Sequence, residues 1–317
     1  MAIFARLILS AALLVAPASV ALAQDYPTKP IRFINGASPE IVPRIFAKIF
    51  TDVLHQPVVV ESIPGAGGKL AAETAAKARP DGYTLFNAIA TFMIYEAQHK
   101  TGGDLSRDYV PVAMMSYTPF VLIVSPNLAV ASVKDLIALA KSKPGQLNYG
   151  ANYGSFPHIA FELFKRMAKI DVVHIAYKRS DEAVPAILSG QTQAAFTPYV
   201  SVAGISKGGK VRTLAVTTAE RSRTIPEIPT VSESGLSGYD LLGWNGFVAP
   251  LGTPPAIVNK INGVVREALK KPEVIKQLAA VGQDPGSDFS PEQFRDFLKV
   301  ETAKWTKLVN DSGFKAN

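Results

Sequence analysis

The sequence predicts an α/β fold of two lobes, each a mostly parallel sheet flanked by helices, with the second lobe inserted into the first. Short apolar runs of strand type alternate with helical patterns twice along the chain, which favours parallel strands joined by crossover helices. The length of 317 residues suits one large or two medium domains. Hydrophobic residues make up 48% of the chain, which is enough apolar material for a folded core.

The first 23 residues have the pattern of a secretory signal peptide. Arg6 precedes an apolar run from Leu7 to Val15, and Ala21-Leu22-Ala23 is a small-x-small cleavage site. We therefore expect cleavage near Ala23 and export to the periplasm. The apolar run is too short for a transmembrane anchor and is closely followed by Pro17. No later stretch reaches about 18 apolar residues, so we expect the mature chain to be soluble.

Between residues 31 and 86 the pattern reads strand, helix, strand, helix, strand. Ile31 to Asn35 is a short run of strand type, and apolar residues recur every four positions from Ile41 to Val53, which predicts a helix over Ile41 to Leu54. The pattern continues with a strand at 58–60, a helix at 70–78 and a strand at 83–86.

The middle of the chain repeats this alternation, and the last third is mainly helical. Ser132 is a suitable N-cap for a predicted helix over 133–141. The following predicted elements are strands at 147–149, 172–175, 194–196 and 213–216, helices at 159–167 and 183–188, and C-terminal helices at 256–269, 272–280 and 291–309.

Several classes of chemistry have little support in the sequence. The chain has no cysteine, which excludes disulfides, thiolate nucleophiles and cysteine-bound metals. The four histidines, at positions 55, 99, 158 and 174, show no metal-binding spacing, and no serine lies in a G-x-S-x-G elbow. The net charge of +7 comes from scattered basic residues rather than a stripe, so nucleic acid is a poor candidate. We predict no catalytic residue, no metal and no cofactor.

A glycine-rich turn, Pro64 to Lys69, precedes a predicted helix. Ile63 and Leu70 stand where a phosphate loop needs glycine and a hydroxyl residue, so nucleotide motifs fail. Backbone N–H groups and the positive end of a helix dipole still suit a carboxylate; the alternative is a tight turn without a ligand. The junctions at 150–155 and 180–181 have similar turn-rich composition.

Short motifs follow one another in a fixed order along almost the whole mature chain. They are YPTKPI at 26–31, QPVVVE at 56–61, PGAGG at 64–68, PDGYTL at 80–85, KPGQLNY at 143–149, AYK at 176–178, GQ at 190–191, IPTV at 228–231, AP at 249–250 and GTP at 252–254. In this order they resemble the substrate-binding proteins of tripartite tricarboxylate transporters, also called Bug (Bordetella uptake gene) proteins.

The resemblance implies a Venus-flytrap fold of the type II kind, with two strands crossing between the lobes near Phe120 to Val124 and Gly246 to Pro250. We accordingly expect a signal peptide at 1–23, lobe 1 at 24–123 and 250–317, and lobe 2 at 124–249. It also implies capture of a small carboxylate, a di- or tricarboxylate, by backbone amides, hydroxyls and waters. Delivery to a membrane permease of the same transporter type follows from the family.

Three positions depart from the family pattern at the expected cleft. Glu40 replaces an aspartate next to the stiffening Pro39, Arg179 replaces a glycine, and Thr197 replaces an aspartate. An aspartate could meet a ligand ammonium group, so Thr197 weakens the case for an amino-acid ligand. Arg179 would add a charge-assisted contact to a carboxylate or be a solvated residue at the rim.

The ligand-binding residues that we predict lie in loops at the strand-to-helix junctions, chosen by family position and loop placement. They are Gly36, Ala37, Ser38, Pro39, Gly65, Ala66, Gly67, Ala90, Thr91, Phe92, Asn152, Tyr153, Ser155, Phe156, Arg179, Ser180 and Thr197.

Aromatic residues on these loops raise the hypothesis of an aromatic ligand such as terephthalate, stacked between the lobes. Ordinary loop packing is the alternative. They are Phe92, Tyr153, Phe156, Tyr199 and Trp244.

Two other functions stay open. The closed protein could signal to a sensor receptor instead of feeding a permease. An exported hydrolase would need a nucleophile–base pair, and none is visible in the sequence. We expect a monomer.

Overall fold

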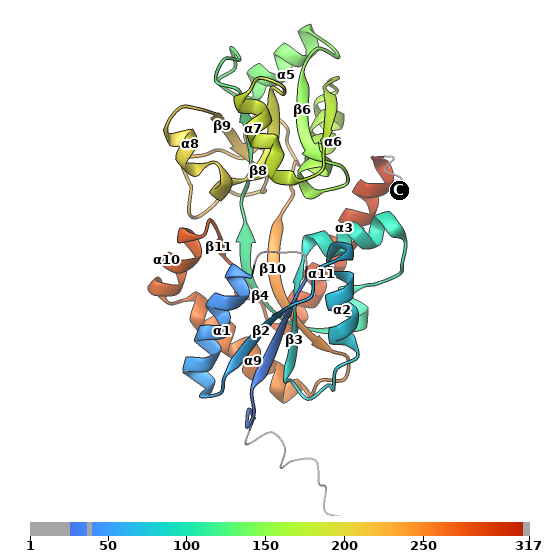
Figure 1. Ribbon diagram of the computed structural model, residues 1–317, viewed down its shortest axis with the longest axis vertical. Coiled ribbons are helices and arrows are strands. Elements are labelled where there is room, and N and C mark those ends of the chain that lie inside the picture. Colours follow the sequence, from blue (N-terminus) through green and yellow to red (C-terminus); the bar gives the residue numbers. More distant parts are fainter. Residues whose placement is uncertain (1–25, 37–39, 313–317) are drawn as a thin grey trace, which may run out of the picture.

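Two β-sheets flanked by helices form two lobes at opposite ends of the long axis in the computed structural model (Figure 1), which describes residues 26–36 and 40–312. The predicted α/β fold of two lobes is confirmed, but the sheets are mixed and not mostly parallel. Antiparallel pairings are three of the five in the first sheet and two of the four in the second. The predicted signal peptide at 1–23 and the predicted site residues Ala37, Ser38 and Pro39 lie outside the described residues.

The sheet of the first lobe combines N-terminal and C-terminal strands. Its strands are β1 (Ile31–Asn35), β2 (Val58–Ser62), β3 (Thr84–Ile89), β4 (Tyr109–Thr118), β10 (Gly243–Pro250) and β11 (Asp284–Pro285). They stand in the order β11-β4-β10-β3-β1-β2. β1 is parallel to β2 and β3, whereas β10 runs antiparallel to both β3 and β4.

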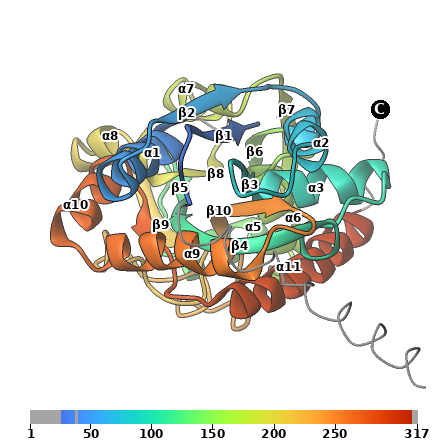
Figure 2. The same ribbon diagram turned by 90° about the horizontal axis from the view of Figure 1, so that it is seen from below.

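Helices cover both faces of this first sheet. They are α1 (Ile41–Leu54), α2 (Lys69–Ala76), α3 (Ala90–His99), α4 (Leu105–Asp108), α9 (Pro255–Leu269), α10 (Pro272–Ala280) and α11 (Pro291–Asp311). A short 3-10 helix, η2 (Ala66–Gly68), precedes α2. Seen along the long axis, α1, α9 and α10 lie on one side and α2, α3 and α11 on the other (Figure 2). The two hydrophobic clusters of this lobe follow the same division.

The second lobe is formed by one continuous stretch of chain. Its strands stand in the order β7-β6-β8-β5-β9. The elements are β5 (Phe120–Val124), α5 (Val133–Ser142), β6 (Asn148–Asn152), α6 (Phe156–Ala168), β7 (Val173–Tyr177), η3 (Ser180–Glu182), α7 (Ala183–Leu188), β8 (Ala194–Pro198), η4 (Tyr199–Ser201), α8 (Ala203–Lys207) and β9 (Arg212–Val216).

The chain passes between the lobes twice, and strand pairing places these two passages at other positions than the predicted ones. β5 pairs with β8 and β9, so Phe120 to Val124 belongs wholly to the second sheet. β10 pairs with β3 and β4, so Gly243 to Pro250 belongs wholly to the first. The boundaries predicted at 123/124 and 249/250 therefore fall too late along the chain. The chain changes sheet at Pro119, which has no N–H to give to a ladder, and just before Gly243.

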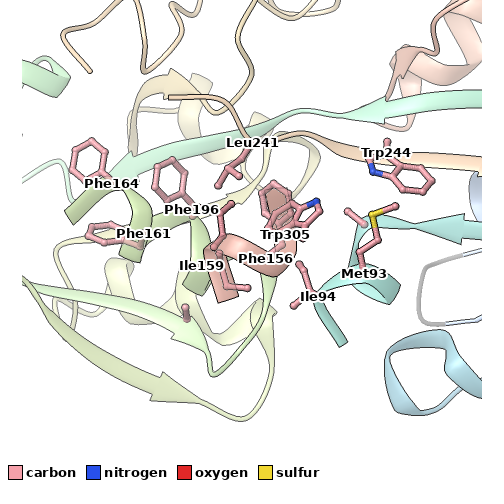
Figure 3. Close-up of a cluster of buried hydrophobic side chains, with 14 of the residues drawn as sticks. Met93, Ile94, Phe156, Ile159, Phe161, Phe164, Phe196, Leu241, Trp244 and Trp305 are labelled. Carbon is pink, nitrogen blue, oxygen red and sulfur yellow. The ribbon is translucent and has the colours of Figure 1, made fainter. Parts of the chain in front are cut away.

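A shared hydrophobic core joins the lobes on one flank. Phe156 at the start of α6 packs against Trp305 of α11, with ring centroids 5.2 Å apart (Figure 3). Both side chains are buried, and α11 starts with a capping box in which Ser290 and Gln293 bond to each other's backbone N–H groups. The flank of α3, α6 and α11 therefore holds the two lobes together.

Candidate functional site

A cavity of about 650 Å³ lies between the two lobes. The first lobe contributes the starts of α1 and α3, and the second contributes the loop from Asn152 to Pro157 and the turn from Pro198 to Ser201. Residues beside the two passages, such as Phe120 and Trp244, form the floor. This position is the one expected for a ligand held between the carboxyl ends of strands.

Three helices begin at the cavity wall. Ile41, Ala90 and Phe156 are the first residues of α1, α3 and α6, and all three line the cavity. The first N–H groups of a helix have no partner within the helix, and the helix dipole makes this end positive. Ile89, the N-cap of α3, is extended and makes no side-chain cap bond. The arrangement gives an anion donors from both lobes.

The described residues of the cavity wall carry no formal charge. Among the described residues that line it, none is Lys, Arg, His, Asp or Glu. An anion in this cavity would be stabilised by fixed dipoles and hydrogen bonds, since no side chain offers a counter-charge there.

Aromatic rings form much of the apolar wall. Phe120 and Phe156 are stacked, with centroids 4.0 Å apart and planes at 22°. Tyr95, Tyr153 and Trp244 also line the cavity. These flat faces suit an aliphatic or aromatic body attached to a polar group.

The buried His158 holds the loop from Asn152 to Phe156 in the second lobe. The Gly154 N–H donates to His158 Nδ1 at 2.9 Å, so this nitrogen must be unprotonated. Burial, and then the neighbouring His174 ring stacked at 3.9 Å, lower the pKa of His158 to about 3. Ser155 caps α6 by accepting from the His158 N–H, and its hydroxyl donates to Asn152 O at 2.6 Å. The loop from Asn152 to Phe156 is thus fixed while His158 is neutral.

Seven predicted site residues lie on the cavity wall. They are Gly67, Ala90, Thr91, Asn152, Tyr153, Ser155 and Phe156. Asn152 is also structural there, because its amide donates to the carbonyl oxygens of Tyr177 and Lys178 and ties β6 to the loop after β7.

Other predicted site residues do not line the cavity, and for most of them the packing of the side chain explains why. Phe92 points into the core beside Phe86, and Thr197 is buried in β8 opposite Val121. The Arg179 guanidinium is exposed and pairs with Asp181, two residues away, at 2.6 Å.

Three further predicted positions, Gly36, Gly65 and Ala66, are also outside the cavity wall. Gly36 is pressed against Gly68, since a Cβ there would lie 2.7 Å from the Gly68 Cα. Gly65 and Ala66 form the turn before α2 without lining the cavity, and Ser180 begins η3. Of the aromatic set, Tyr199 does not line the cavity either.

Several lining residues were missed by sequence reasoning. Tyr95 and Gln98 lie on α3, a helix that was not predicted. Asn245 and Gln283 come from β10 and from the residue before β11, far from any glycine-rich turn. The glycine and motif signals used for the prediction mark backbone turns, so they could not reveal side chains from other elements.

Two further findings concern the described part of the chain as a whole. In residues 26–36 and 40–312, no three His, Cys, Asp or Glu side chains gather as a metal site would require. No helix in those ranges combines the length and hydrophobicity needed to cross a membrane.

Comparisons with known proteins agree on one family. The model of the tripartite tricarboxylate transporter family receptor matches residues 42–314. The Bordetella pertussis protein BugT is 33% identical over 98% of both chains. Two solved structures are similar in fold: R. palustris Rpa4515 with adipate has a TM-score of 0.76 at 29% identity, covering 91% of this chain and 98% of that one. MatC from Rhodopseudomonas palustris with bound malate has a TM-score of 0.73 at 26% identity, covering 90% and 100%.

Proposed function

The chain belongs to the tripartite tricarboxylate transporter receptors, the Bug family of solute-binding proteins, and from this premise we propose that it captures a small organic carboxylate in the cavity between its lobes. The observation that carries the proposal is an uncharged cavity at which α1, α3 and α6 all begin. The adipate and malate named with the two R. palustris relatives are both carboxylates.

The proposed mechanism is capture without chemical conversion. A carboxylate at the start of α3 in the first lobe accepts backbone N–H bonds and interacts with the positive end of the helix. The start of α6 in the second lobe contributes the Phe156 N–H as the opposing donor, since Pro157 has no N–H and the His158 N–H donates to Ser155. Because one anion then contacts both lobes, binding favours the conformation in which they are close together.

The uncharged lining of the cavity favours a ligand that carries few charges. Each carboxylate that enters must exchange its water for hydrogen bonds, and no described lining residue supplies a counter-charge. An acid with one or two carboxylates and an apolar middle therefore suits this cavity better than a tricarboxylate. The rings of Phe120 and Phe156 give that middle a flat surface.

We also propose a periplasmic location and delivery of the ligand to a membrane permease of the tripartite tricarboxylate type. The signal-peptide pattern of residues 1–23 supports the location. The family assignment supports the permease as partner.

A thermal-shift screen of the mature chain, starting at Gln24, tests the carboxylate proposal. At a concentration one hundred times the dissociation constant, a ligand adds about 2.7 kcal/mol to the free energy of unfolding, which raises the melting temperature by roughly 5 °C for a chain of this size. We expect such a shift from members of a set containing adipate, malate, benzoate, terephthalate and citrate. Sugars and amines serve as controls; stabilisation by these and not by any organic acid would contradict the proposal.

A further inference from the structure

A polar cluster lies on the cavity wall beside the start of α3, because Asn245 of β10 is the sheet partner of Ile89, the N-cap of that helix. Gln283 Oε1 accepts hydrogen bonds from Ser116 Oγ at 2.9 Å, Thr118 Oγ1 at 3.0 Å and Asn245 Nδ2 at 3.4 Å. These donors come from β4 and β10, the strands that lead to the two passages between the lobes. Gln283 and Asn245 both line the cavity, although they are only 8% and 6% exposed.

This cluster fixes the orientation of the Gln283 amide. Three neighbours converge on one atom of the amide, and an NH₂ group has only two hydrogens to give. The oxygen therefore faces the cluster, and the NH₂ group has no hydrogen-bond partner among the described residues. A buried donor of this kind is costly unless a ligand or water satisfies it.

Asn245 has an unused hydrogen-bond acceptor, its side-chain oxygen. Its Nδ2 donates to Ser116 Oγ at 3.2 Å as well as to Gln283. The Asn245 Oδ1 atom then has no partner within the described part of the chain. This part of the cavity wall thus offers one unused donor, on Gln283, and one unused acceptor, on Asn245.

We propose that Gln283 and Asn245 form a second subsite, which binds a hydroxyl group of the ligand close to its carboxylate. A hydroxyl accepts from the Gln283 NH₂ and donates to the Asn245 oxygen, so it satisfies both groups. A second carboxylate can only accept, and it would face the Asn245 oxygen with no counter-charge beside it. The proposal rests on the proposed function and narrows its ligand to a hydroxylated monocarboxylate with an apolar body.

The test compares matched acids by isothermal titration calorimetry on the mature chain. One series is hexanoate, 3-hydroxyhexanoate and 2-propylsuccinate; the other is benzoate, 3-hydroxybenzoate and isophthalate. In the series whose length fits the cavity, we expect the hydroxylated acid to bind about tenfold more tightly than the plain acid and the dicarboxylate, the effect of one well-placed hydrogen-bonding group.

Variants of Gln283 test whether its side-chain amide causes the tighter binding of hydroxylated acids. Gln283→Met removes the NH₂ group at similar volume, and the hydroxylated acid should then bind within about twofold of the plain acid. Gln277→Met makes the same chemical change on the exposed face of α10 and should keep the tenfold preference. Melting temperatures without ligand show whether each variant is folded.

A second variant covers the case in which Gln283→Met does not fold. Gln283→Glu keeps an oxygen for the three donors but replaces the NH₂ group with a negative oxygen. It should reduce the hydroxyl preference, because the ligand hydroxyl loses the NH₂ group from which it accepts, and it should weaken the binding of every acid in the series.

Two results would overturn the proposal in different ways. If plain acids or dicarboxylates bind as tightly as hydroxylated ones, or if the preference is undiminished in the Gln283 variants, the subsite is wrong while carboxylate capture stands. If no acid of either series binds, both carboxylate capture and the subsite fall.

Discussion

Gln98 in the first lobe donates a hydrogen bond from Nε2 to the carbonyl oxygen of Gly154 in the second lobe, at 2.7 Å. Both residues line the cavity. Gly154 has a φ of 72°, and a Cβ added to it would lie 2.5 Å from Gln98 Nε2. Its N–H group donates to His158, so both polar backbone groups of Gly154 are used, one within its lobe and one between lobes.

Gly154→Ala should weaken ligand binding because of this contact. The new methyl group displaces the end of the flexible Gln98 side chain and breaks its bond between the lobes, in addition to a backbone cost of about 1 kcal/mol at positive φ. We expect about a tenfold rise in the dissociation constant of the best carboxylate of the screen, measured by calorimetry. Gly190→Ala is the matched control: Gly190 also lies in the second lobe at φ 80°, with open space around it. Equal loss of affinity in both variants would contradict the role of the interlobe contact.

Gln98→Leu should shorten the lifetime of the complex. It removes the interlobe hydrogen bond, worth about 1 kcal/mol, and leaves the Gly154 carbonyl without this partner. We expect the dissociation rate of the bound acid, followed by stopped-flow fluorescence, to rise about fivefold while the association rate changes little. An unchanged dissociation rate would show that this bond does not stabilise the closed form.

Ala90→Pro tests the backbone donor at the start of α3. Proline is well tolerated at the first position of a helix, and the preceding Ile89 is extended, as a residue before proline should be. The variant removes one N–H group from the cavity wall. We expect carboxylate affinity to fall 10- to 100-fold, as for a lost hydrogen bond to a charged group. Ala90→Gly keeps the N–H and should bind nearly as the parent does, and comparable loss in the two variants would count against the donor.

The histidine pair predicts that stability falls in mild acid. The pKa of His158 is lowered to about 3 in the folded chain, mainly by burial, against about 6.5 when unfolded. Burial also lowers the pKa of His174. Between pH 6.5 and 3 the unfolded chain therefore binds more protons, and the free energy of unfolding decreases as the pH falls, by up to about 1.4 kcal/mol per pH unit for one histidine.

Melting curves of the parent and of His158→Asn check this prediction between pH 7 and 4. The asparagine oxygen replaces Nδ1 as the acceptor for the Gly154 N–H but does not titrate in this range. We expect the variant to lose less stability per pH unit than the parent. Parallel pH profiles would mean that His158 does not control the acid sensitivity.

Sequence patterns predicted elements well where one face of a helix is buried. The bounds of α1, α7 and α10 agree with the predicted ranges, since local spacing and prolines define them. α3 was missed because it carries consecutive buried residues, Phe92, Met93 and Ile94, which show no helical period. It lies between the sheet and α11, so both of its faces meet other elements.

The site was predictable only as far as local turns define it. The loop from Asn152 to Phe156 was found because its glycine, serine and aromatic residues are adjacent in sequence. Gln283 was not, since its orientation depends on Ser116, Thr118 and Asn245, which reach it only through sheet pairing. Arg179 is the opposite case: its partner Asp181 lies two residues away, which fits the solvated rim residue that the sequence left open.

The uncharged lining of the cavity has a consequence for the surroundings in which the protein acts. Dissolved salt weakens attraction between exposed charges over about 10 Å at 0.1 M ionic strength, but it acts little on donors that touch a buried anion. The chain carries a net charge of +7, so salt should slow the arrival of an anionic solute. Once the solute is enclosed by neutral dipoles, its rate of escape should be nearly the same in dilute and in saline media.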